Sequence, residues 1–488
     1  MPELSPAKRA LLNRYLAGKL KSTDGIPRRT TGPIAPQSLN QEQVWTHSQI
    51  IGSKPAYNEL ITIHRRGPLD IPTLERAIDA LTRRHEIWRT TFEMGENSPV
   101  QIIHASAAPV KLRVFDLRTL ALADRARECT RLAAADGRTP FNLTKLPLWR
   151  AILVRLADDE YQLHMNLHQL VLDGVTVYRT LLPELIALYN GTALQEPAPQ
   201  YADFSIWQRA KLTDEALQPH LEWWKKQLAG PLPTLGWPNE KPRPEVQSYN
   251  GATEMLRVPL GITDGLRAYA ERESATLFMA LAAGFFTLMH LYTGETDIIL
   301  GMPTAARSRE TEGIMGYFLN LLPVRVDLSH NPTNREVLRR VRAAVLDALE
   351  HGQVPLLKLL EAVRPKRDDS RNPLFQIMIS LEPPMAPVDP AWDLTQASVS
   401  SGSTKMDMYL NLDTRPDGLM APIMYNPDLL ESATVRRMFD DWQSVLQAAA
   451  SSPDCPIAEL VLNKKEIPTA IEKPTFAGRL KGWLKRTA

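Results

Sequence analysis

The chain has 488 residues, of which 44% are hydrophobic and 23% charged, and its formal net charge at pH 7 is +2. This composition is typical of soluble globular proteins and excludes a disordered or fibrous chain, and the near balance of charge gives no indication of nucleic-acid binding. Because the length exceeds that of one ordinary core, we expect two lobes.

The first 37 residues are predicted to form a short helix followed by a linker. The opening MPELSPAKRALLNRYLAGKL lacks the apolar core of a signal peptide, and Ser5 followed by Pro6 is a helix-start signal. KSTDGIPRRTTGPIAPQ, residues 21–37, has prolines and glycines without apolar periodicity. The two cysteines stand far apart without metal-ligand spacing, so we expect a reducing, cytoplasmic location, no disulfide and no metal.

Residues 38–200 are predicted to form the first lobe. TLERAIDALTRR, residues 73–84, has apolar residues at helical spacing, whereas EYQLHMNL, residues 160–167, alternates as a strand does. Residues 201–244 are then the connection between the lobes. That connection ends in GPLPTLGWPNEKPRP, whose five prolines exclude a regular helix or a central strand.

Residues 245–463 are predicted to form the second lobe, with strands at 297–302 and 321–328 and a helix at 333–351. Residues 274–294, SATLFMALAAGFFTLMHLYTG, carry no charge and are long enough to span a bilayer. However, polar side chains such as Ser274, Thr287 and His290 lie along the segment, and no basic or aromatic anchors flank it. We therefore predict a buried core helix and no membrane span.

Residues 464–488 form a basic tail. Its last part, PTFAGRLKGWLKRTA, places Phe476, Leu480, Trp483 and Leu484 on one helical face. The tail is either a helix packed on its own protein or a frayed end, and the alternative is a docking or membrane-surface segment.

A motif near the end of the predicted strand at 160–167 holds the candidate chemistry. It reads MNLHQLVLDGVTVY, residues 165–178, with His168 and Gln169 ahead of Asp173 and Gly174. Gln169 has an amide that donates and accepts hydrogen bonds but no accessible pKa, so it cannot serve as a general base.

Six further stretches join this motif in a family pattern. With them, the chain from about residue 37 to 463 resembles the condensation domains of nonribosomal peptide synthetases. The resemblance implies an α/β fold of two chloramphenicol acetyltransferase-like lobes in a V with a central tunnel. It also implies that donor and acceptor carrier proteins present phosphopantetheine thioesters at the tunnel mouths, and that no cofactor is bound. The stretches are SLNQEQVW (38–45), RHEIWRTTF (84–92), YADFSIW (201–207), GYFLNLLPVR (316–325), HGQVPLLKLLE (351–361) and RDDSRNPLF (367–375).

The resemblance gives the motif residues their expected roles. In this family the pattern is His-His-x-x-x-Asp-Gly, and its second histidine acts at the acceptor amine; Gln169 stands there, and His168 is the first histidine. A shift of one residue on an extended segment turns a side chain to the opposite face. We therefore expect His168 to be an interior histidine. Gly174 is expected to allow a tight backbone next to the substrate arm.

The same resemblance implies roles for several other residues. Asp173 is expected to pair with an arginine of the second lobe's crossing loop, Arg307 or alternatively Arg309, because a buried carboxylate needs a partner. Asn320 and Ser370 are the residues expected along the tunnel. RHE at 84–86 and the loop 367–375 are expected to be scaffold.

Two functions are compatible with Gln169. The first is an enzyme that joins a carrier-bound acyl or peptidyl thioester to an amine by positioning the two, with Gln169 as a hydrogen-bond partner. The second is a silent module that docks carrier proteins or recruits a tailoring enzyme. No stretch outside the family pattern is long enough for an adenylation or carrier domain. The protein is therefore expected to act in trans or to be one piece of a larger assembly line.

Overall fold

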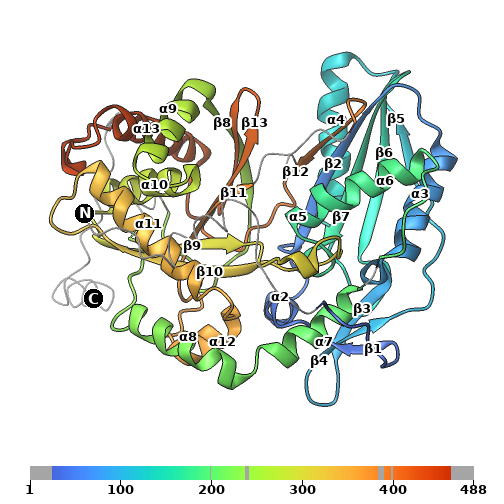
Figure 1. Ribbon diagram of the computed structural model, residues 1–488. Coiled ribbons are helices and arrows are strands. Elements are labelled where there is room, and N and C mark those ends of the chain that lie inside the picture. The colour runs from blue at the N-terminus through green and yellow to red at the C-terminus, as the bar shows by residue number, and fades with distance from the viewer. Residues whose placement is uncertain (1–24, 198, 237–240, 383–388, 397–398, 463–488) are drawn as a thin grey trace, which may run out of the picture.

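The computed structural model describes residues 25–197, 199–236, 241–382, 389–396 and 399–462. Its α/β elements form two lobes that lie side by side (Figure 1). The short helix predicted to start at Ser5 and the basic tail both lie outside the described residues. The α/β class expected from the sequence is confirmed, and the predicted helix at 73–84 and strand at 160–167 are both present.

The first lobe is built on a five-stranded sheet in the order β12-β2-β7-β6-β5. The helices α3 and α6 pack against each other, and α4 packs on β2, β6 and β7. The elements are α2 (Leu39–Ile51), β2 (Asn58–Arg66), α3 (Ile71–Arg84), η1 (Glu86–Arg89), β5 (Arg113–Asp116), α4 (Leu122–Gly137), β6 (Trp149–Ala157), β7 (Glu160–His168), η2 (Gln169–Val171), α5 (Gly174–Thr176), η3 (Val177–Leu181), α6 (Leu182–Tyr189) and β12 (Trp392–Gln396).

A small sheet in the order β1-β4-β3 extends this lobe, with β1 (Ile34–Pro36), β3 (Thr90–Met94) and β4 (Pro99–Ile103). The sequence predicted a linker over 21–37, and at residues 34–36 that prediction is wrong. Proline is tolerated there because β1 is an edge strand, where a missing N–H costs no pairing. Ser38 then caps α2, and its hydroxyl accepts a hydrogen bond from the backbone of Gln41.

The second lobe contains a six-stranded sheet in the order β10-β9-β11-β13-β14-β8. α7 and α8 lead into it from the first lobe. The elements are α7 (Tyr201–Lys211), α8 (Asp214–Gln227), β8 (Ala252–Pro259), α9 (Leu260–Arg272), α10 (Leu277–Thr293), β9 (Asp297–Thr304), η4 (Arg309–Thr311), β10 (Asn320–Asp327), α11 (Asn334–Glu350), α12 (Leu356–Val363), β11 (Ile377–Glu382), β13 (Met408–Arg415), β14 (Gly418–Tyr425), α13 (Ser432–Ser451) and η5 (Ile457–Glu459).

The uncharged segment is α10, a core helix as predicted. Thr276 caps its start by accepting from the backbone of Met279, and Gly294 ends it in a left-handed conformation. Its side chains are buried almost all round, against α9, α11 and α13. Among the described residues no single helix is long and apolar enough to cross a membrane, although the pair of α9 and α10, bent by 104°, meets those criteria together.

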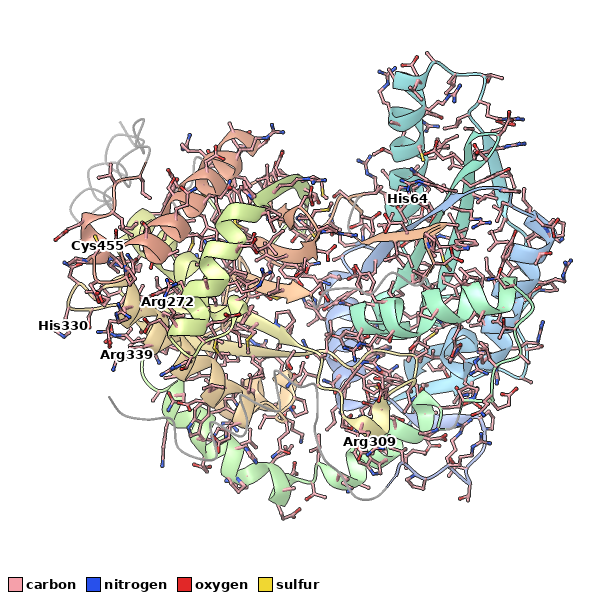
Figure 2. All side chains as sticks on the ribbon, turned by 45° about the horizontal axis from the view of Figure 1, so that its top comes forward. His64, Arg272, Arg309, His330, Arg339 and Cys455 are labelled. Atoms are coloured by element: carbon pink, nitrogen blue, oxygen red, sulfur yellow. The ribbon has the colours of Figure 1, made fainter. Side chains whose placement is uncertain are left out.

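The two lobes share more than a linker. β12 comes from the range assigned to the second lobe, yet it pairs antiparallel with β2 in the sheet of the first. His64 of β2, labelled in Figure 2, shares a 3.1 Å hydrogen bond with the hydroxyl of Thr395 on β12. Residues 314–318, ahead of β10, also pack into the first lobe's core. These crossings place the end of β7 next to the second lobe.

Candidate functional site

His168 ends β7 and is an interior residue. Its side chain is 5% exposed, and its Nδ1 accepts a 3.2 Å hydrogen bond from the backbone N–H of Leu170. The ring contacts Tyr57 and Phe141, with centroids 5.9 and 6.2 Å away. Burial, with a smaller contribution from the charge of Lys405, lowers the pKa of His168 to about 3. The imidazole is therefore neutral at physiological pH and supports the turn after β7.

Gln169 begins η2 and has its amide fixed at one end. Its backbone N–H donates to the carbonyl of Tyr57 at 2.9 Å, and its side-chain Oε1 accepts from Nζ of Lys405 at 2.8 Å. A charged lysine can only donate hydrogen bonds. The amide oxygen of Gln169, and not its NH₂ group, therefore faces Lys405. In the part of the chain that the structure describes, Nε2 of Gln169 has no hydrogen-bond acceptor. Its two N–H groups therefore keep their hydrogen-bonding capacity unused among these residues.

Lys405 comes from the segment before β13, 236 residues from Gln169 in the sequence. Its Nζ lies 3.6 Å from Oε1 of Glu59 and 4.6 Å from the centre of the Tyr57 ring. Burial lowers the pKa of Lys405, and the carboxylate of Glu59 opposes that shift. Lys405 was not predicted from the sequence, because a lone lysine in STKMDM carries no motif signal and its partners are distant in sequence.

Asp173 connects the motif to the second lobe. It is 3% exposed, and its carboxylate accepts from Arg307 Nη2 at 2.9 Å and from the backbone N–H of Thr176 and Phe318 at 2.7 and 3.1 Å. The Arg307 guanidinium also lies 4.0 Å from the centre of the Phe318 ring. Arg307, rather than Arg309, is therefore the partner of Asp173.

The remaining motif positions build the surrounding backbone. Gly174 is the first residue of α5, directly after Asp173 as its cap. Arg309 lies in η4, on the crossing segment, where Figure 2 labels it. The network at 84–86 is scaffold, since Arg84 Nε and His85 Nε2 both bond the carboxylate of Glu184, at 2.9 and 2.6 Å.

Asn320 and Ser370 hold loops of the second lobe. Nδ2 of Asn320 donates to the carbonyls of Gly352 and Val354 at 2.9 and 2.7 Å, while its buried Oδ1 has no partner among the described residues. The hydroxyl of Ser370 donates to Asp368 at 2.5 Å. Neither side chain has a hydrogen bond to Gln169 or Lys405 within the described chain, so the structure does not join them to the motif.

One face of β11 and β13 adds polar groups that were not predicted from the sequence. The register pairs Ser380 with Asn411 and Glu382 with Asp413, which places these side chains on one face of the sheet. Burial raises the pKa of Glu382 to about 7, and the negative charges of Asp173, Asp413 and Glu59 add to the shift. Asp173 and Glu59 belong to the first lobe, so charges from both lobes act on the Glu382 carboxyl group.

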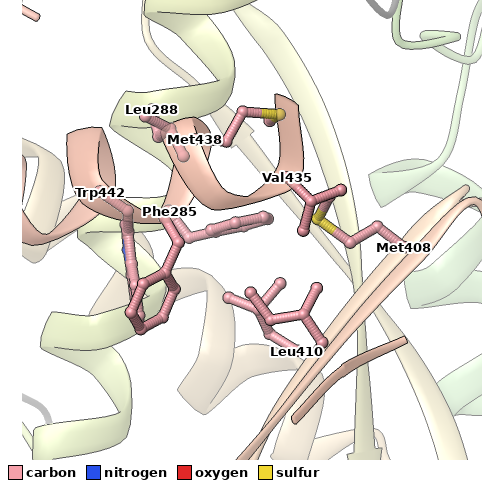
Figure 3. Close-up of a pocket in the computed structure, with 9 residues that line it drawn as sticks. Phe285, Leu288, Met408, Leu410, Val435, Met438 and Trp442 are labelled. Carbon is pink, nitrogen blue, oxygen red and sulfur yellow. The ribbon is translucent and has the colours of Figure 1, made fainter. Parts of the chain in front are cut away.

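A small cavity lies elsewhere, between α10, α13 and the strands β13 and β14 (Figure 3). Its volume is about 10 Å³, and its walls include Phe285, Leu288, Met408, Leu410 and Trp442. It is a packing gap within the apolar core of the second lobe and carries no chemistry. No group of three or more potential metal ligands occurs among the described residues.

Comparison with known proteins identifies the family. The model of the condensation domain matches residues 33–468, almost the whole chain. The chain belongs to the condensation domain family of nonribosomal peptide synthetases. One of the linear gramicidin synthase proteins from Brevibacillus parabrevis is 36% identical over 444 residues, which cover 88% of this chain and 8% of that protein. The chain therefore spans a small part of the length of that synthase.

Solved structures with the same fold include the X-domain from teicoplanin biosynthesis, alone and in a complex. The X-domain from teicoplanin biosynthesis is 26% identical, with a TM-score of 0.78 over 90% of this chain and all of that one. The X-domain in its complex with OxyB gives a TM-score of 0.77 and 25% identity, over 91% of this chain and all of the X-domain. The fold expected from the resemblance is confirmed.

Within this condensation domain, the motif can donate hydrogen bonds but cannot take up a proton. Gln169 offers N–H groups, Lys405 offers a positive charge, and His168 is enclosed. Such donors act on an oxygen that becomes negative during reaction. The arrangement therefore fits stabilisation of a tetrahedral oxyanion better than general-base catalysis.

Proposed function

We propose that this condensation domain joins an acyl or peptidyl group, presented as a carrier-protein thioester, to an amine acceptor and forms an amide bond. The observation that supports this most directly is the geometry of Gln169. Its Oε1 is held by Lys405 at 2.8 Å, and its N–H groups have no acceptor within the described chain. An amide oriented in this way can donate to the thioester oxygen as negative charge develops there.

The missing base restricts the acceptor. Loss of a general base costs about 10²- to 10⁴-fold in rate, whereas holding two reactants together supplies an effective molarity of roughly 10⁵ to 10⁸ M. An α-amine has a pKa of about 8, so part of it is already neutral at cellular pH. An alcohol is a poor nucleophile until it is deprotonated. The site thus suits amines and disfavours alcohols.

The proposed reaction implies carrier proteins as partners. The donor, and the acceptor when it is also carrier-bound, arrive on the phosphopantetheine arms of carrier proteins, and the domain itself needs no bound cofactor. The protein receives these carriers either as a free-standing chain or as one section of a longer synthetase. The basic tail at 464–488, outside the described residues, is a candidate docking segment for them.

The test is intact-mass spectrometry of a loaded donor carrier mixed with an amine acceptor and the protein. We expect wild type to convert the donor to amide at least tenfold faster than the protein-free mixture, and Gln169→Ala to lose most of that gain. An alcohol acceptor of similar size should give no ester above the blank. Efficient ester formation by wild type would contradict the proposed preference for amines.

A second function has its own support. The X-domain, 26% identical to this chain, is seen in a complex with the protein OxyB, and a motif without a base fits a recruiting module. This alternative predicts that wild type leaves the donor unchanged while Gln169→His gains turnover. In that case the protein would be a docking module for a partner protein.

A further inference from the structure

Lys405 is a positive charge from the second lobe placed directly against the motif of the first. It contacts three groups there: the amide oxygen of Gln169 at 2.8 Å, the carboxylate of Glu59 at 3.6 Å and the face of Tyr57 at 4.6 Å. Its side chain is 22% exposed, so water screens the charge only in part. The nearest of the three groups is the neutral amide.

We propose that Lys405 is a positioning residue for amide formation, which orients Gln169 so that its N–H groups meet the oxyanion and which adds positive charge behind them. This inference rests on the proposed condensation function and goes beyond it, because it makes the active arrangement a pair of residues from two lobes. Gln169 alone could rotate its amide and present oxygen, which would repel an oxyanion. A donor fixed at Oε1 prevents that rotation.

The geometry argues against a role for Lys405 that is limited to joining the lobes. Arg307 and Asp173 already make a buried ion pair between them at 2.9 Å. A lysine serving only as a lobe contact would be expected to bond Glu59 most closely. Instead, Nζ is 0.8 Å nearer to Gln169 Oε1 than to the Glu59 carboxylate, at 2.8 against 3.6 Å. The shorter contact is to the side chain at the reacting position.

The reaction step that the pair serves is balanced without a resident base. The acceptor nitrogen forms a bond to the thioester carbon while the carbonyl electron pair moves to oxygen. When the carbonyl forms again, the C–S bond breaks and the phosphopantetheine sulfur leaves with its electron pair. The proton lost from nitrogen passes through water to that sulfur. The oxyanion in the middle of this sequence is the species that Gln169 and Lys405 stabilise.

The charge of Lys405 also has an effect that can be measured without turnover. A nearby cation disfavours protonation of an imidazole, and Lys405 already contributes to the lowered pKa of both His47 and His168. An imidazole introduced by Gln169→His would take the place of the amide beside Nζ. Its pKa should lie below the ordinary 6.5.

NMR titration of that imidazole is the first experiment. We expect its pKa in Gln169→His to rise by at least half a unit when Lys405→Met is added. Lys111→Met is the matched control, because Lys111 is an exposed lysine paired with Glu75, and it should leave the value unchanged. An equal pKa with and without Lys405 would overturn the proposed contact, whether or not the protein is an enzyme.

Single-turnover kinetics is the second experiment. Lys405→Met should lower the rate constant of amide formation at least tenfold while the KM for the loaded donor carrier changes less than twofold, and Lys405→Arg should restore part of the rate. In the Gln169→Ala background, Lys405→Met should lower the rate constant of amide formation little further, because the amide that Lys405 orients is absent. An equal loss in both backgrounds would overturn positioning through Gln169. If wild type itself gives no turnover, the proposed function fails and the titration alone decides the contact.

Discussion

Three buried histidines of the first lobe have pKa values well below the ordinary value of 6.5. Burial lowers the pKa of His47 and His164 to about 4 and that of His168 to about 3. Each has neutral hydrogen-bond partners: Tyr57 and Tyr249 for His47, Thr62 and Cys129 for His164, and the backbone of Leu170 for His168. The stability of the first lobe should therefore depend on pH through these histidines.

Acid should destabilise the protein in a window set by these histidines. Their folded-state pKa values lie below the ordinary 6.5, so their contribution to stability is complete above pH 6.5 and is lost as pH falls toward 3. Each contributes a slope of up to about 1.4 kcal/mol per pH unit. Glu382, with its pKa raised to about 7, acts in the opposite direction, as do Asp407 and Asp413, whose pKa values burial also raises.

His168→Asn tests this assignment at one position. The amide keeps an acceptor for the Leu170 N–H but does not titrate, so the free energy of unfolding between pH 6 and 4 should fall less steeply, by about 1.4 kcal/mol per pH unit. Urea unfolding across pH 4.5 to 7.5 measures the slopes. Identical slopes in the two proteins would show that His168 is protonated in the fold.

At the scale of elements, α10 shows how packing can outweigh helix propensity. The helix lies in the second lobe's core, and α13 crosses it with Trp442 and Leu446 near Gly284. A Cβ at Gly284 would overlap Cδ2 of Leu446. This glycine is thus required by close packing between two helices, although glycine weakens an isolated helix.

Gly284→Ala should therefore lower stability. Alanine gains about 1 kcal/mol of helix propensity, whereas forcing a methyl group into a packed core costs about 1 to 3 kcal/mol, and the adjacent core side chains leave little room to relax. Gly265→Ala in α9 is the control, since nothing lies within 4 Å of its added Cβ, and it should gain stability. Differential scanning calorimetry separates the two, and a rise in Tm for both variants would rule out the close-packing argument.

The elements differ in how far the sequence alone predicts them. α3, α10 and α11 follow from apolar spacing and capping residues, which act within a few residues of each other. η2, α5 and the π-helical turn η3 were not predicted. Their conformation follows Asp173, whose partners Arg307 and Phe318 lie in the second lobe, 134 and 145 residues further along the chain. Local patterns carry no information about such contacts.

At the scale of the whole molecule, the lobes are joined by a strand, a loop and ion pairs. β12 completes the first lobe's sheet, where His64 and Thr395 meet although they are 331 residues apart. The resemblance to a family supplied Gln169, Asp173 and Arg307 as positions of interest. Lys405 and β12 could not be inferred, because both depend on how the lobes meet.

Asp173→Asn should weaken this connection. Removing one charge of a buried pair leaves the other without compensation, at a cost of about 3 to 5 kcal/mol. The double variant Asp173→Asn with Arg307→Met should cost less than the sum of the single variants, because it removes the uncompensated guanidinium. Denaturant unfolding of the four proteins provides the coupling energy. Additive losses would mean that the pair contributes no coupling between the lobes.

The most direct test of amide synthesis by this domain is a single-turnover time course with wild-type protein in excess over a loaded donor carrier and an amine acceptor, followed by intact mass. We expect amide product to accumulate at least tenfold faster than in the protein-free mixture, and Gln169→Ala to remove most of this acceleration. A time course that coincides with the protein-free mixture would contradict amide synthesis at Gln169 and Lys405, and would favour the recruiting module.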